Sequence, residues 1–180
     1  MKITIKMKKG KALSRKEMSL INKQRIKEFG RNETKNLKTD YPLTSEFIFV
    51  KEGKEVVAFG ILIPITITFL DKKYDIIGIC SIISIKKGKG YGKILSRYII
   101  TYLNRKGKTG LGFTLQTKFF KKAGFKTKKR FIKRFKYRNL ATGKIEEDNE
   151  GDGIFIEGKD KFITKILSTK SSVFIDIPFW

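Results

Sequence analysis

Apolar positions along the chain follow two different periods, and they predict strands and helices in alternation. Residues 1–7 alternate polar and apolar side chains, as a half-buried strand does. Ser14 then offers an N-cap to a segment with Met18, Ile21 and Phe29 on one helical face. We therefore expect the chain to begin with a strand followed by a helix.

Three antiparallel strands are expected next. Residues 31–45 are polar and lack a period, which indicates a loop or a short helix that could border a substrate site. The stretch FIFVKEGKEVVAFGILI has two apolar runs around Glu52-Gly53, which predicts a hairpin. A second turn at Asp71-Lys72-Lys73 precedes the apolar stretch 74–85.

After a glycine-rich segment the period becomes helical. Apolar residues recur at helical spacing at Ile94, Leu95, Tyr98, Ile99, Tyr102 and Leu103. Gly107 closes this segment, and residues 110–115 predict the next strand.

Composition narrows the class of protein. With 180 residues and 40% hydrophobic content, one core and one domain over residues 1–180 are expected. No apolar run approaches the roughly 20 residues that span a bilayer, and the first residues do not resemble a secretory signal. We expect a soluble cytoplasmic protein with no membrane partner. Cys80 is the only cysteine and is interpreted as core filler.

Histidine is absent, and the formal net charge is +24. The absence removes the usual general base, the usual zinc ligand and every Ser-His or Cys-His arrangement, so no metal site is expected. The charge would attract nucleic acid, an anionic membrane or a polyanionic small molecule, but a lysine-rich coding bias gives the same composition. Charge alone therefore does not decide the function.

The segment 85–95, IKKGKGYGKIL, lies at a strand-to-helix junction. The first amides of a helix have no intrahelical partner, and the helix dipole adds partial positive charge, so a phosphate can bind there. Glycine lets a bulky anion approach the main chain, and Lys87, Lys89 and Lys93 would reinforce the site.

Two motifs resemble those of the GNAT superfamily of N-acetyltransferases. Residues 87–92, KGKGYG, resemble the acetyl-CoA loop of that family, with Lys87 where the family prefers Arg or Gln. The segment lacks the Gly-Lys-Ser/Thr of a P-loop. Residues 119–125, FFKKAGF, resemble the family's Phe-Tyr-x-Lys-x-Gly-Phe segment, in which a short helix ends at the position of Gly124 and Phe125 enters the core.

This resemblance implies an α/β (α+β) fold with helices around a mixed, mostly antiparallel sheet that splays between its fourth and fifth strands. It implies an N-acetyltransferase that transfers an acetyl group from acetyl-CoA to a primary amine on a small molecule or peptide, as a monomer or homodimer. The implied coenzyme-binding residues are Ile82, Ile83, Ser84, Lys87, Gly88, Lys89, Gly90, Tyr91, Gly92 and Lys93.

The proton-transfer groups are harder to assign. Phe120 stands where the family often has a tyrosine that protonates the leaving thiolate, so water, Thr117 or Tyr91 are the alternatives. Asp75 is the carboxylate nearest to the strand before the loop, and we interpret it as a turn residue. The ordinary pKa of an alkyl ammonium, about 10.4, requires deprotonation before attack.

The end of the chain is similar to that of aminoglycoside N-acetyltransferases. By that analogy Asp152, Asp176 and the Trp180 carboxylate would hold a cationic acceptor and accept its proton through water. The favoured alternative is a solvated acidic loop at 146–153 followed by an apolar tail that packs on the core as a strand or cover.

A different function class rests on residues 126–138, which interleave Phe131, Phe135 and Tyr137 with cations. On a strand they could expose a basic, aromatic face for nucleic acid. The commoner arrangement turns the aromatic side chains inward. The alternative function is thus a GNAT-fold protein with lost or altered catalysis that binds nucleic acid or protein.

Overall fold

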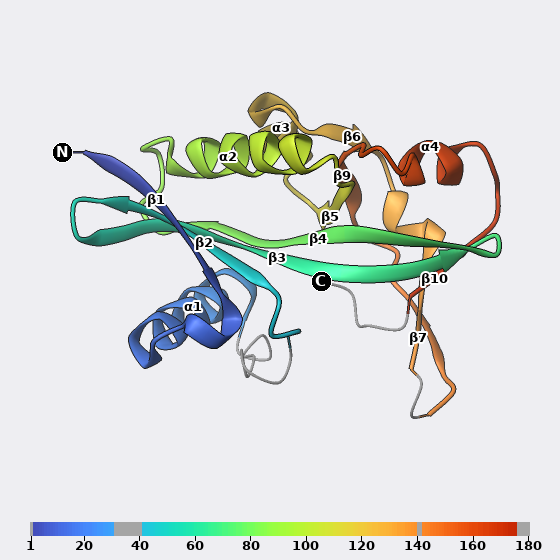
Figure 1. Ribbon diagram of the computed structural model, residues 1–180, viewed down its shortest axis with the longest axis horizontal. Helices are drawn as coiled ribbons and strands as arrows, with labels where there is room; N and C mark the ends of the chain where they lie inside the picture. Colours follow the sequence, from blue (N-terminus) through green and yellow to red (C-terminus); the bar gives the residue numbers. More distant parts are fainter. Residues whose placement is uncertain (1, 31–40, 140–141, 176–180) are drawn as a thin grey trace. The chain divides into compact units, whose positions relative to one another are not determined.

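The computed structural model describes residues 2–30, 41–139 and 142–175, and it shows the predicted alternation of strands and helices (Figure 1). The helices are α1 (Arg15–Phe29), α2 (Tyr91–Lys106), α3 (Thr117–Ala123), α4 (Phe162–Leu167) and the 3-10 helices η1 (Gly10–Ala12) and η3 (Phe131–Arg134). The strands are β1 (Ile3–Lys9), β2 (Glu46–Glu52), β3 (Glu55–Phe69), β4 (Lys72–Ser84), β5 (Gly110–Thr114), β6 (Lys126–Lys128), β7 (Phe135–Arg138), β8 (Ile145–Glu147), β9 (Asp152–Ile156) and β10 (Val173–Ile175). None of the described helices has the length and apolar character needed to cross a bilayer.

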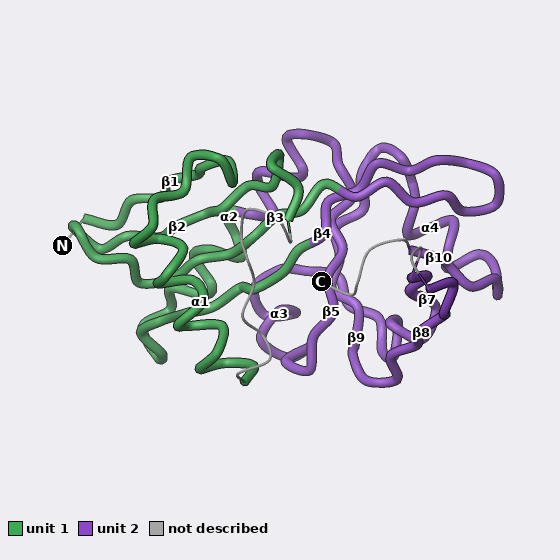
Figure 2. Tube along the Cα trace, turned by 90° about the horizontal axis from the view of Figure 1, so that it is seen from below, with its two compact units in different colours: residues 1–64, 79–98 green, residues 65–78, 99–180 purple. Residues whose placement is uncertain are grey.

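The chain divides into two compact units (Figure 2). Unit 1 comprises Met1–Pro64 and Ile79–Tyr98, and unit 2 comprises Ile65–Gly78 and Ile99–Trp180. Strands β3 and β4 and helix α2 each contribute residues to both units. A single domain over the whole chain stays a prediction.

Most strand pairs are antiparallel, and the sheet is mixed. Within the described residues, hydrogen bonds order the larger sheet as β1-β2-β3-β4-β5-β9-β6 and the smaller one as β10-β7-β8. Strands β4 and β5 are parallel, and their ladder comprises Ile77↔Gly110 and Gly78↔Leu111. This ladder covers two residue pairs, although β4 continues to Ser84 and β5 to Thr114. The predicted fold class, a mixed, mostly antiparallel sheet with flanking helices, is confirmed.

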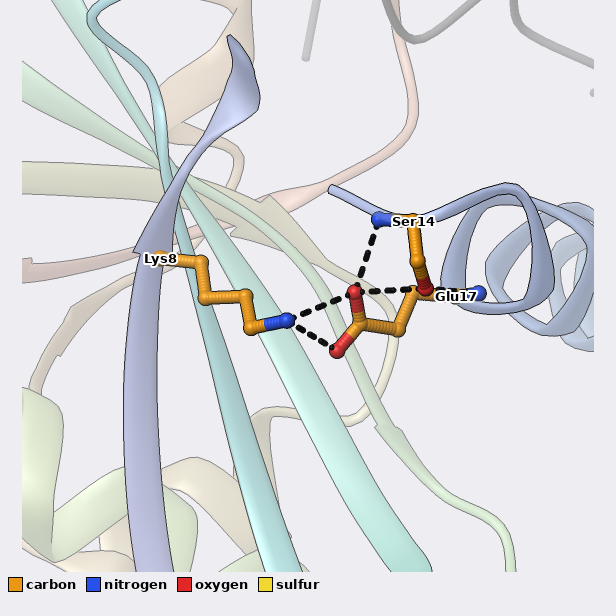
Figure 3. Close-up of polar contacts among 3 residues, drawn as sticks. All are labelled: Lys8, Ser14 and Glu17. Carbon is orange, nitrogen blue, oxygen red and sulfur yellow. Dashed lines mark hydrogen bonds and ion pairs between the residues drawn. The ribbon is translucent and has the colours of Figure 1, made fainter. Parts of the chain in front are cut away.

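Helix α1 begins at the predicted N-cap (Figure 3). The Glu17 amide donates to Ser14 Oγ (3.2 Å), and the Ser14 amide donates to Glu17 Oε2 (2.9 Å), which completes a capping box. Lys8 of β1 forms an ion pair with the same carboxylate (2.8 Å). Burial alone would raise the pKa of Glu17, but the hydrogen bonds from Lys8 and Ser14 outweigh it and lower the pKa. The helix start is therefore bound to β1.

The two halves of β3 differ in burial. Every residue from Val57 to Ile63 is buried, as expected for a strand covered on both faces. Beyond that point the pattern alternates: Ile65, Ile67 and Phe69 are buried, and the positions between them are exposed. The first part of β3 is thus covered on both faces, and its last part is covered on one face.

Both hairpin turns differ slightly from the prediction. The first turn lies at residues 53–54, one position later than Glu52-Gly53. The second is formed by Leu70 and Asp71, at φ 49° and 59°, where Asp71-Lys72-Lys73 was predicted. Two-residue turns with positive φ match the twist of the flanking strands. The strands therefore continue into polar residues such as Lys72 and Lys73, which the sequence had assigned to the turn.

Candidate functional site

The end of β4 lies in unit 1 and contains a break in the strand geometry. Ser81 has φ 49° three residues before the end of this strand, although L residues rarely adopt such values. Its hydroxyl accepts a hydrogen bond from the Arg25 guanidinium of α1, and both side chains are buried. Four consecutive residues, 78–81, are buried there, so the alternation of side chains is interrupted. Positive φ at a non-glycine residue costs free energy and is common at functional sites.

The predicted coenzyme residues of β4 follow this break. Ile83 is buried, whereas Ile82 and Ser84 are half-buried. The amides of Ile85 and Lys86 both donate to the Val57 carbonyl of β3 (2.9 and 3.4 Å). The last residues of β4 are therefore fixed just before the chain enters the glycine loop.

The glycine loop requires glycine at two positions. Gly88 and Gly90 have φ 75° and 79°, which strain any residue with a Cβ. A Cβ on either residue would have no atom within 4 Å. The two glycines therefore expose main chain to open space, as the sequence predicted for an approaching anion.

Free amides run through this loop into helix α2. Among the described residues, no acceptor is found for the six successive amides of residues 87–92. The first bonds of the helix run from the Lys93 and Ile94 amides to the Gly90 carbonyl (3.0 and 3.1 Å). Residues 87–90 are exposed, and 91–92 are buried. Unpaired amides at the positive end of a helix dipole form a site that suits phosphate.

Lysines at the start of the loop form ion pairs with glutamates of α1 and of the β2–β3 hairpin. Lys87, predicted to reinforce phosphate binding, forms an ion pair with Glu28 of α1. Lys86 pairs with Glu55 (2.7 Å) and Glu52 (3.7 Å) at the β2–β3 hairpin. The hydrogen bond to Glu55 raises the pKa of Lys86.

Tyr91 has a buried ring at the first position of α2. A hydrogen bond to the Glu52 carboxylate raises the pKa of its hydroxyl. The hydroxyl thus stays neutral and connects the helix start to the hairpin. Lys89 and Lys93 are exposed and form no ion pair within the described residues, so they are the cations available to an anion.

Thr117 and Asp152, predicted to serve as acid and as acceptor ligand, contact each other within unit 2. Thr117 Oγ1 donates to Asp152 Oδ2 (2.6 Å), and the Arg130 amide donates to Asp152 Oδ1 (2.8 Å). The hydrogen bond from Thr117, with that from Arg130, lowers the pKa of Asp152. The carboxylate holds the start of α3 to the turn after β6, and a low pKa makes it a weak base.

Phe120 is buried in α3, and its ring contacts those of Phe119 and Phe125 at centroid distances of 5.0 and 5.7 Å. Gly124 ends the helix at φ 113°, and Phe125 is buried, as the resemblance implied. Asp176 and Trp180 lie outside the described residues, so their roles stay predictions. The tail before them pairs as β10 with β7 in parallel.

Two interpretations of the sequence are wrong. Asp75 is not a turn residue: it lies within β4, where its carboxylate accepts a hydrogen bond from Thr66 Oγ1 (2.7 Å). Residues 126–138 do not form one strand, because a turn at Arg130 (φ 50°) and η3 separate β6 from β7. Phe131 and Phe135 are buried there, which confirms that these aromatic side chains turn inward.

The contacts around the loop include Arg25 and Glu28, which were not expected from the sequence, and Glu52, which was expected only as a turn residue. Arg25 and Glu28 are three positions apart on α1 and contact Ser81 and Lys87, which are 56 and 59 positions away in sequence. The burial of Arg25 is seen only in the structure, and the sequence has no signal that pairs residues so far apart.

Comparison with known proteins supports the fold assignment. No protein-family model and no curated sequence matches the chain. Among solved structures, a Bacillus subtilis acetyltransferase in complex with CoA shares 15% identity at a TM-score of 0.57, over 87% of this chain and 99% of that one. A GNAT family acetyltransferase from Elizabethkingia anophelis with acetyl-CoA bound shares 19% identity at a TM-score of 0.50, over 85% and 95%.

A GCN5-related N-acetyltransferase from Anabaena variabilis matches with a TM-score of 0.55 and 11% identity, over 69% of this chain and 32% of that one. The chain thus spans about a third of that protein. At these identities the likeness concerns the fold, and the chain has the fold of the GNAT acetyltransferases.

Proposed function

We propose that the chain is an N-acetyltransferase that binds acetyl-CoA on residues 82–93 and transfers the acetyl group to a primary amine. The observation that carries this proposal is the run of six unpaired amides at the start of α2. The structural neighbours with CoA or acetyl-CoA bound support it.

In this proposal the loop binds the diphosphate of the coenzyme. The amides of residues 87–92 donate to phosphate oxygens, and Lys89 and Lys93 add positive charge. Gly88 and Gly90 leave room for the anion, since a Cβ on either would project into open space. Residues 82–84 of β4, beyond its last pairing with β5, then have main-chain groups available to the pantetheine arm.

The transfer itself is a direct attack. The neutral amine nitrogen forms a bond to the thioester carbonyl carbon, the C–S bond breaks, and the CoA thiolate leaves. The nitrogen then gives up one proton to solvent to become the neutral amide, and the thiolate takes up one proton. A strand amide that donates to the carbonyl oxygen would stabilise the negative charge that develops there. Of the proton-transfer candidates, Tyr91 and Thr117 both donate their hydroxyl protons to carboxylates. Water therefore remains the simplest proton donor to the thiolate.

The test combines binding and turnover. Calorimetric titration should show one acetyl-CoA per chain, and dephospho-CoA should still bind because the loop recognises the diphosphate. A thiol-release assay over amines, polyamines, aminoglycosides and peptides should then identify an acceptor. Binding without thiol release for every amine would reduce the function to coenzyme binding, and absence of binding would refute the site.

A further inference from the structure

Acidic residues are missing from the middle of the sequence. Between Ile76 and Ile145 there are twenty lysines and arginines and no aspartate or glutamate, while all 17 acidic residues lie outside this stretch. A lysine-rich coding bias raises lysine everywhere but does not remove acidic residues from one region. An even distribution would place more than a third of them there. The segregation therefore indicates a selected anionic partner.

Acetyl-CoA accounts for only the first part of this stretch. The coenzyme, where it binds as proposed, contacts residues up to Lys93. Fifteen of the twenty cations lie at position 105 or beyond. These include the cations on helix α3 and strand β6 in unit 2, two elements that contact each other.

The exposed face of α3 is cationic. Lys118, Lys121 and Lys122 are exposed and lie three or four positions apart, so they share one side of the helix. Phe120 and Ala123 are buried on the other side. The short helix thus packs its apolar side into unit 2 and presents lysines to solvent.

Strand β6 and the segment after it continue the pattern. Lys126 and Lys128 are exposed on the same face of the strand, and Lys133 of η3 is also exposed. In the described parts of the chain these three lysines and the three of α3 form no ion pair. The turn residues Lys129 and Arg130 are exposed too, and Asp152 is the carboxylate that interacts with them.

Lysines elsewhere in the described residues form ion pairs. Lys8, Lys9, Lys86 and Lys87 of unit 1 and Lys136 of unit 2 each pair with a glutamate. Unpaired cations repel one another and do not stabilise a fold, so the six of them on α3, β6 and η3 have no structural explanation.

We propose that these exposed residues of α3, β6, the following turn and η3 form a cationic surface that binds the phosphodiester backbone of a nucleic acid. The surface is defined as Lys118, Lys121, Lys122, Lys126, Lys128, Lys129, Arg130 and Lys133. A chain of phosphates supplies one negative charge per nucleotide, which matches cations spread along a helix and a strand. Phe119, 37% exposed on α3, provides an aromatic edge for a base. The proposal does not depend on acetyl transfer.

A membrane surface matches these observations less well. Interfacial helices insert a broad apolar face, whereas the apolar side of α3 is already buried. Leu115 and Phe119 are the exposed apolar side chains next to this surface, and two such residues do not make an inserting face.

The experiment measures affinity as a function of salt. Fluorescence anisotropy with a labelled 20-nucleotide single-stranded RNA and with a DNA duplex of equal length gives the slope of log K against log salt. Two triple variants, Lys118→Gln/Lys121→Gln/Lys122→Gln and Lys126→Gln/Lys128→Gln/Lys129→Gln, should each reduce that slope by about 2 to 3. Affinity at fixed salt should fall by at least about tenfold. The RNA and DNA arms decide which nucleic acid binds.

A matched control removes the same charge elsewhere. Lys11→Gln/Lys16→Gln/Lys23→Gln changes three exposed lysines of unit 1. This variant should change the slope by less than about 1. An equal decrease of the slope and of the affinity in the control variant would show that net charge alone drives binding and would overturn the proposal. Stronger binding to poly-glutamate or to phosphatidylserine vesicles than to nucleic acid would do the same, as would displacement of nucleic acid by saturating acetyl-CoA.

Discussion

Replacing Gly90 with alanine distinguishes an effect on coenzyme binding from an effect on stability. Gly90 has φ 79°, and a Cβ there would have no atom within 4 Å. The new methyl group therefore contacts no other part of the protein. It projects into open space beside the amides proposed to receive the diphosphate.

Two magnitudes follow from this geometry. An L residue at left-handed φ costs about 1–2 kcal/mol, which in a protein of this size lowers Tm by roughly 2–8 °C. Loss of one hydrogen bond to a charged phosphate costs about 1.5–3 kcal/mol, so the affinity for acetyl-CoA should fall roughly 10- to 100-fold. The substitution should thus weaken binding measurably while leaving the protein folded, and a control with the same folding cost separates the two effects.

Gly143 provides the matched control. It has φ 69°, and a Cβ there also has no atom within 4 Å. Gly143→Ala should therefore lower Tm by about as much as Gly90→Ala while leaving the calorimetric Kd for acetyl-CoA unchanged. Equal affinities in the two variants would refute the assignment of the diphosphate to the glycine loop.

Four further substitutions test contacts within one or the other of the two units. Tyr91→Phe removes the hydroxyl that joins α2 to the hairpin carboxylate, and calorimetry should show roughly three- to tenfold weaker acetyl-CoA binding; unchanged affinity would exclude a positioning role. Ser14→Ala breaks the capping box and should cost about 0.5–2 kcal/mol in thermal unfolding, whereas Ser19→Ala, exposed in the same helix, should be neutral or stabilising. The folded-state pKa of Glu17 is lowered, so its carboxylate stabilises the fold fully above the unfolded-state pKa, and this stabilisation is lost as the pH falls through the folded-state pKa. Glu17→Gln should therefore make the free energy of unfolding depend less on pH in this range. Asp152→Asn should cost about 1–2 kcal/mol of stability, and a raised KM for the amine with unchanged acetyl-CoA affinity would show that it also holds the acceptor.

Local signals in the sequence located the elements and the loop. The helix cap at Ser14, the hairpins and the glycine segment 85–95 depend on residues within a few positions of each other, so periodicity and turn residues were enough to find them. The fold class then followed from the order of elements and two short motifs.

Other features depend on contacts between distant residues. The left-handed conformation of Ser81 lies in an apolar strand with no glycine at that position, and its partner Arg25 is 56 residues away. Residues 126–138 look like one alternating strand, but packing of Phe131 and Phe135 turns the backbone into a 3-10 helix between two short strands. Tertiary packing overrides local alternation in such cases.

The contacts around the glycine loop differ in what they contribute to binding. The loop is held at both ends, by the Val57 carbonyl before it and by the buried Tyr91 after it. Ordering a residue costs about 1–2 kcal/mol, so a loop already ordered in the free protein saves that cost when the coenzyme binds. The ion pair of Lys87 with Glu28 is more exposed, and surface pairs contribute about 0–1 kcal/mol. The backbone and the tyrosine, rather than the lysine, should therefore determine how tightly the loop holds a diphosphate.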